Sequence, residues 1–150
     1  MGALPISTGT VYPAPYDAAV RGRTRVRLGD AAGLSQFGVN LVTLPPGTAS
    51  SHRHWHRSED EFVLVLSGEV VLEEDDGEAI LRAGEAAGFP AGRAVGHRLI
   101  NRSDAAATFL EIGTRAQNEV STYTEEAVNM QAVKENGGAW QLRRKDGTPY

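Results

Sequence analysis

Residues 52–68 of the chain read HRHWHRSEDEFVLVLSG. Three of the protein's four histidines lie in the first five positions of this stretch, and three acidic residues follow at 59–61. Side chains at positions i and i+2 share a face of an extended segment, so His54 and His56 can present their imidazoles to one cation. Imidazole and carboxylate groups suit zinc, iron, manganese, nickel or copper. An isolated His-x-His pair more often lies in a solvated loop, so a metal site needs further support.

The apolar run that follows the histidines gives this support. It begins at Glu61 and alternates, so that Glu61, Val63 and Val65 point one way and the residues between them point the other way. A carboxylate that starts an inward-facing row needs a partner, because an unpaired buried charge is costly. A carboxylate a few residues after the two histidines would complete a set of three protein ligands, and Glu61 is the candidate, with Glu59 in reserve.

Short apolar or alternating runs recur along the middle of the chain, separated by turn residues such as glycine, proline, aspartate and asparagine. Runs at such short spacing, with no long helical stretch between them, predict an all-β sandwich or barrel. The predicted strands are residues 37–44, 61–66, 69–73, 79–82, 94–100 and 108–112.

The ends of the chain differ from this middle part. Residues 1–22 contain three prolines, and proline fixes φ and removes a backbone donor, so we predict an extended N-terminal arm. The barrel is expected at residues 23–115. Residues 116–150 are expected to form a tail that packs on the barrel or on a partner. Within this tail, Thr124 as an N-cap, two acidic residues after it and glycines at 137–138 predict a short helix over 124–135.

Composition excludes several classes of function. The chain has 150 residues, no cysteine and a net charge of −4. Disulfide scaffolds, iron–sulfur clusters and thiol nucleophiles are therefore excluded, and the length suits one domain. The negative charge opposes binding to nucleic acid or to an anionic membrane. No apolar run approaches the roughly 20 residues that cross a bilayer, so we expect a cytoplasmic protein.

Two groups of residues resemble the conserved motifs of the cupin superfamily, as found in small single-domain microbial members. The first motif matches Gly47, His54, His56, Glu61 and Gly68, and the second matches Gly84, Pro90, Gly92, His97 and Asn101. One extra residue separates Gly47 from His54, and two extra residues separate Gly92 from His97. These insertions affect loop lengths rather than the identity of the residues in the motifs.

The resemblance implies a cupin-type double-stranded β-helix, that is, a jelly-roll barrel. It also implies one divalent metal ion, such as Fe, Mn, Zn or Ni, held by His54, His56, Glu61 and His97. Three neutral imidazoles and one carboxylate leave an octahedral divalent ion with two open positions. Open positions favour catalysis or ligand capture over a purely structural metal.

The resemblance leaves the reaction open. We expect a small polar metabolite as ligand, with a sugar-phosphate isomerase or epimerase as the first hypothesis and a dioxygenase or a non-enzymatic sensor as alternatives. His52, Arg53 and Arg98 are the candidate substrate-binding residues, although His52 also suits a surface position. The sequence identifies no general acid or base; Tyr12, Tyr16, His52 and Glu59 qualify if the fold turns them inward. The arm and an exposed sheet edge predict a homodimer in which the arm crosses to a neighbour.

Overall fold

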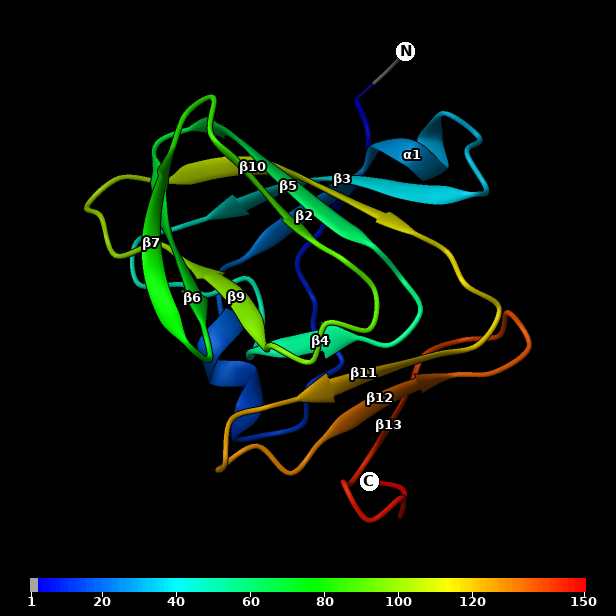
Figure 1. Ribbon diagram of the computed structural model, residues 1–150. Helices are drawn as coiled ribbons and strands as arrows, with labels where there is room; N and C mark the ends of the chain where they lie inside the picture. The colour runs from blue at the N-terminus through cyan, green and yellow to red at the C-terminus, as the bar shows by residue number, and fades with distance from the viewer. Residues whose placement is uncertain (1–2) are drawn as a thin grey trace.

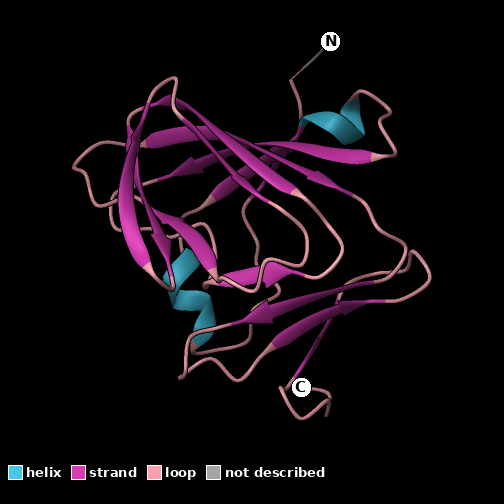
Figure 2. Cartoon of the chain, in the orientation of Figure 1, coloured by secondary structure: helices cyan, strands magenta, loops and turns pink. Residues whose placement is uncertain are grey.

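The computed structural model describes residues 3–150, which form two antiparallel sheets and two short helical segments (Figures 1 and 2). The six-stranded sheet has the order β1 (Ile6–Ser7), β2 (Thr24–Arg27), β3 (Phe37–Leu44), β10 (Ala107–Thr114), β5 (Glu61–Ser67), β8 (Ala86–Phe89). The seven-stranded sheet has the order β13 (Gln141–Arg143), β12 (Gln131–Lys134), β11 (Glu119–Tyr123), β4 (His54–His56), β9 (His97–Ile100), β6 (Glu69–Glu74), β7 (Gly77–Arg82). The helical segments are η1 (Tyr16–Val20) and α1 (Leu28–Ala31). The predicted all-β jelly-roll architecture is confirmed.

The main core lies between the two sheets. In β5, Val63 and Val65 are buried, whereas Phe62 and Leu66 remain 43% and 46% exposed, as the alternation in the sequence predicts. The core residues come from both sheets: Val42, Leu44, Val63, Val65, Val70, Leu72, Phe89, Leu99, Ala107 and Phe109.

Strand pairing sets the register of the residues that form the site. In the seven-stranded sheet, His54 of β4 lies opposite His97 of β9 on one side and opposite Tyr123 of β11 on the other. In the six-stranded sheet, Glu61 of β5 lies opposite Phe89 of β8. The two sheets therefore bring residues that are distant in the sequence to facing positions.

Gly68 makes the turn between β5 and β6 possible. Its φ of 72° is a conformation that glycine adopts without strain. A Cβ atom at this position would lie only 2.9 Å from the carbonyl oxygen of Ala106. Any larger residue would therefore shift β5, the strand that carries Glu61.

The N-terminal arm lies along its own chain. Ile6 pairs with Val26 at the edge of the six-stranded sheet. Further on, Tyr12 and Tyr16 pack against a second buried cluster, which consists of Tyr123, Val128, Met130 and Ala132. The expectation that the arm crosses to a neighbouring molecule stays a prediction. None of the helical segments in residues 3–150 has the length and apolar character needed to cross a membrane.

The predicted helix over 124–135 is wrong. Residues 131–134 form β12, and a turn at 126–127 precedes it. Thr124 does not cap a helix, because its hydroxyl bonds to the carboxylate of Asp75 at 2.7 Å. Val128, Met130 and Ala132 are buried at a spacing of two residues, which suits an extended chain rather than a helix.

Candidate metal centre

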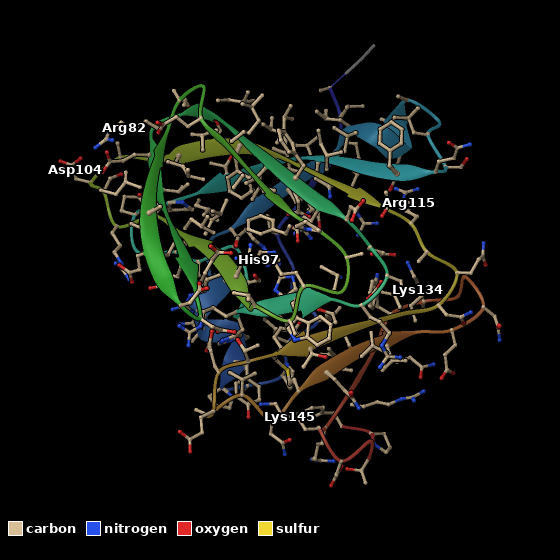
Figure 3. All side chains as sticks on the ribbon, in the orientation of Figure 1. Arg82, His97, Asp104, Arg115, Lys134 and Lys145 are labelled. Carbon is tan, nitrogen blue, oxygen red and sulfur yellow. The ribbon has the colours of Figure 1, made fainter. Side chains whose placement is uncertain are left out.

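Four side chains from the two sheets converge inside the barrel. Oε2 of Glu61 lies 2.9 Å from Nε2 of His97, 3.6 Å from Nε2 of His56 and 3.9 Å from Nε2 of His54. The ligand atoms of His54, His56 and Glu61 all lie within 4.8 Å of one another. Figure 3 shows His97 in the interior of the molecule. The structure thus brings together the four residues that the sequence proposes as ligands.

Hydrogen bonding decides which nitrogen of His54 faces the site. Its Nδ1 lies 2.9 Å from the backbone carbonyl oxygen of His52 and donates to it, because a carbonyl only accepts. Nε2 therefore carries the lone pair, as a metal ligand requires. Burial, together with the nearby His56 and His97, lowers the pKa of His54 to about 3. The ring is neutral at physiological pH and free to bind a cation.

Phe89 and Glu61 position His97. The rings of Phe89 and His97 stack with their centroids 3.6 Å apart and their planes 2° apart. Burial raises the pKa of Glu61, but its hydrogen bond with His97 and the surrounding imidazoles lower it, with a net value of about 2. Glu61 is consequently an anionic carboxylate among imidazoles.

Two further glutamates lie near His56, and both already have partners. Glu119 has a fully buried side chain and accepts hydrogen bonds from the backbone amides of residues 57 and 58, which fixes the turn after β4. Glu59 accepts a hydrogen bond from Nζ of Lys134 at 2.5 Å. These two carboxylates form a second group with His56, with ligand atoms within 4.8 Å of one another. Glu61, rather than the alternative Glu59, contacts the imidazole of His97.

The donor set fits a divalent transition metal. Imidazole nitrogen and carboxylate oxygen are the ligands that Zn, Fe, Mn and Ni sites use. With four protein ligands, an octahedral ion keeps two positions for water or a ligand. All four residues line a cavity of about 700 Å³ between the sheets, a volume within the range of small-molecule sites.

Comparisons with known proteins agree with this fold. The family profile described as a cupin domain matches residues 40–113. A crystal structure of a sugar phosphate isomerase of the cupin superfamily from Silicibacter pomeroyi is 47% identical to this chain, with a TM-score of 0.91; the match covers 99% of this chain and 92% of that chain. The chain belongs to the cupin superfamily.

Other cupin structures are more distant. A proposed sugar phosphate isomerase from Acidithiobacillus ferrooxidans is 31% identical, with a TM-score of 0.72 over 85% of this chain and 80% of that chain. A cupin protein from Bacteroides fragilis is 27% identical, with a TM-score of 0.53 over 61% of this chain and 76% of that chain. A comparison with curated proteins gives no significant match.

In this cupin, two of the candidate substrate-binding residues lie away from the cavity wall. His52 is buried rather than at the surface, and its ring nitrogens lie 2.9 Å from the carboxylate of Glu125 and 2.9 Å from the carbonyl oxygen of Tyr16. Arg53 makes an ion pair with Asp75 at 3.4 Å. Neither lines the cavity. Both hold loops around β4 together.

The third candidate, Arg98, does line the cavity, but two carboxylates already balance its charge. Its Nε donates to Glu73 at 2.5 Å, and its Nη1 donates to Glu125 at 3.3 Å. These bonds fix the guanidinium on β9 and leave it less able to attract an anionic substrate.

The cupin cavity also contains polar and aromatic residues that the sequence analysis did not select. They come from β2 and the residue before it, from β10, β11 and β12, and from the C-terminal tail. The alternation of arginines at positions 23, 25 and 27 was a signal for one inward-facing row, whereas nothing in the sequence indicated that the tail returns to the cavity. These residues are Arg23, Arg25, Glu111, Tyr123, Lys134 and Trp140.

Proposed function

We propose that this cupin is a metal-dependent isomerase of phosphorylated sugars. The observation that carries the proposal is the convergence of three imidazoles and one carboxylate on the wall of a cavity of about 700 Å³. The names of the Silicibacter pomeroyi and Acidithiobacillus ferrooxidans proteins favour this reaction over the other reactions that cupin metal sites perform. Isomerisation of a hydroxy aldehyde to a hydroxy ketone moves protons between neighbouring atoms and needs no oxidant or reductant.

The residues of the chain have distinct tasks in this proposal. A divalent ion held by His54, His56, Glu61 and His97 would polarise the substrate carbonyl when bound. The hydrogen bond of His54 to the backbone of residue 52 keeps Nε2 available for that ion. The indole of Trp140, whose centroid lies 6.4 Å from that of His56, offers an apolar surface for a sugar ring.

Proton transfer needs a group that is not a metal ligand, and the pair Glu59–Lys134 meets this condition. Both residues line the cavity, and Nζ of Lys134 lies 2.5 Å from Oε1 of Glu59. Nζ also lies 4.9 Å from the ring centroid of Trp140, which faces the cavity. We assign to Glu59 the removal of a proton from the substrate carbon and its return to the neighbouring carbon.

The test is isomerisation in deuterated water. The purified protein, loaded separately with Mn, Fe, Zn or Ni, is incubated with pentose and hexose phosphates, and the products are followed by NMR. We expect interconversion of an aldose phosphate and its ketose phosphate, with solvent deuterium at the carbon that exchanges its proton. The His97→Ala variant is the matched control and should be inactive. Absence of turnover with every metal, or oxygen uptake that depends on substrate, contradicts the proposal.

A further inference from the structure

Arg23 is a buried cation without an acidic partner. The residue lines the cavity, and only 9% of its surface is exposed to solvent. Its Nη1 donates to the carbonyl oxygen of Ser50, and within residues 3–150 no carboxylate oxygen lies within ion-pair distance of its guanidinium. Burying a charge is costly unless an opposite charge pairs with it. The position therefore favours an anionic ligand.

Arg25, on the same face two residues further along, adds a second unsatisfied group. Its Nη2 donates to Oε2 of Glu111 at 3.1 Å, but its Nε is buried and has no hydrogen-bond partner. The other oxygen of Glu111 accepts a hydrogen bond from Asn40 at 3.3 Å. A buried donor without an acceptor costs free energy, and a ligand oxygen at this place would remove that cost.

The charges at this end of the cavity do not balance. Glu111 pairs with Arg25, and Arg23 has no carboxylate of its own within ion-pair distance. Burial and then the neighbouring charge of Arg25 lower the pKa of Arg23, which is the direction expected when a cation lacks an opposite charge. Arg23, Arg25 and Glu111 together therefore carry one positive charge in excess, which an anionic ligand would balance.

This place adjoins the candidate metal centre. Ser50, which binds Arg23 through its carbonyl, is followed by Ser51, whose hydroxyl lies 3.3 Å from Nδ1 of His54. The hydroxyl of Tyr12 lines the same cavity and accepts a hydrogen bond from Tyr123 at 3.1 Å, so its own proton is available to a ligand. One small molecule can therefore reach both the arginines and the metal centre.

We propose that Arg23 and Arg25 form the subsite for the phosphate group of the ligand, beside His54. Guanidinium groups bind phosphate through paired, charge-assisted hydrogen bonds, and these two retain free donors. The hydroxyl of Tyr12 adds a neutral donor. That the rest of the ligand is a sugar rests on the proposed function, whereas the phosphate subsite itself does not.

Titration with inorganic phosphate tests the subsite without any turnover. Isothermal titration calorimetry is performed on the metal-loaded wild type and on Arg23→Gln and Arg25→Gln, with circular dichroism to verify folding. We expect each substitution to weaken phosphate binding by at least about tenfold, since each removes a charged donor. His97→Ala, which removes a metal ligand, should still bind phosphate, which separates this subsite from phosphate bound directly to the ion.

Arg21→Gln is the matched control. Arg21 precedes Arg23 by two residues, but it does not line the cavity, its side chain is 77% exposed and it lies 3.9 Å from Asp17, so its loss should leave phosphate affinity unchanged. Arg25→Gln could fail to fold, because Glu111 loses its partner. In that case Arg25→Lys tests the subsite, since lysine keeps the charge that pairs with Glu111 but lacks the forked donors of arginine. Wild-type affinity in a folded Arg23→Gln or Arg25→Lys protein overturns the subsite, as does the absence of phosphate binding to the wild type.

The outcomes also separate the subsite from the reaction. Phosphate binding that depends on the two arginines, in a protein that isomerises nothing, supports the subsite and refutes the proposed reaction. Isomerisation of a sugar phosphate with an unchanged KM in Arg23→Gln and Arg25→Lys supports the reaction and refutes the subsite.

Discussion

His97 and Glu61 are 36 residues apart in the sequence, yet Nε2 of His97 and Oε2 of Glu61 lie 2.9 Å apart. His97 belongs to the seven-stranded sheet and Glu61 to the six-stranded sheet. The contact therefore joins the two halves of the barrel at the point where the ligands of the candidate metal meet. A bound ion would take the place of this hydrogen bond and link the same two sheets.

Removal of His97 should separate metal binding from folding. In His97→Ala we expect metal affinity to fall by at least about 100-fold. Substitution of a residue that only supports a metal ligand already lowers affinity by up to about 100-fold, and loss of a ligand itself should cost at least as much. The core between the sheets should keep the barrel folded. Elemental analysis and circular dichroism measure the two properties. Full metal content would show that His97 is not a ligand, and unfolding would assign the ion a structural role.

Replacing Glu59 should reduce turnover without affecting the metal. In Glu59→Gln we expect kcat to fall by about 10²- to 10⁴-fold, the usual contribution of a general base, while metal content and KM stay near wild type. Glu135→Gln, at a glutamate whose side chain is 62% exposed, is the control and should behave as wild type. Unchanged kcat in Glu59→Gln would exclude Glu59 as the base.

The carboxylate of Glu125 should make stability depend on acid pH. Burial raises its pKa, but the hydrogen bonds from His52 and from the amide of Arg53, with the charge of Arg98, lower it to about 2. The unfolded chain has a higher pKa and takes up the proton first, so the stabilisation is present above about pH 4.5 and is lost as the pH falls toward 2.

Glu125→Gln tests this dependence. The free energy of unfolding at pH 7 should fall by about 1–3 kcal/mol, because His52 loses a charged partner, and part of the acid dependence should disappear. Urea unfolding between pH 2 and pH 7 gives both quantities. Equal pH profiles for the wild type and Glu125→Gln would contradict the role of this carboxylate.

We predict that a homodimer forms through the outer face of the six-stranded sheet. Cross-strand pairs place one apolar residue of each strand in a continuous row, and such a face on an isolated chain favours burial against a second copy. The row consists of Ile6, Val26, Leu41, Leu110, Leu64 and Ala86.

A substitution on this face tests the dimer. Light scattering should report a dimer for the wild type at tens of micromolar and a monomer for Leu110→Glu. Ile80→Glu, at a residue 48% exposed on β7 of the other sheet, should remain dimeric. A monomeric wild type contradicts the prediction.

The sequence predicted the strands and the candidate ligands whose signals are local. The alternation after Glu61 gave the inward face of β5, and the spacing of His54 and His56 gave two residues on one face of β4. His97 came from the resemblance to a family, because a single histidine in a strand has no local signal. The structure adds the reason for its position, which is the pairing of β4 with β9.

Other features depend on contacts that the sequence does not display. Thr124 and the acidic residues after it have the composition of a helix start, but Asp75 and His52, which are far away in the chain, bind Thr124 and Glu125 and hold the segment extended. The inward arginines Arg23 and Arg25, just before and in β2, were missed for a similar reason, since Thr24–Arg27 is too polar to read as a core strand. Polar residues that line a cavity resemble surface residues in a sequence.

A crystal structure with anomalous diffraction data at the absorption edge of the bound metal tests the central claim most directly. We expect one anomalous peak with the nitrogens of His54, His56 and His97 and an oxygen of Glu61 at about 2.0–2.2 Å. A protein without metal, or a peak bound instead by Glu59 and Glu119, would contradict it.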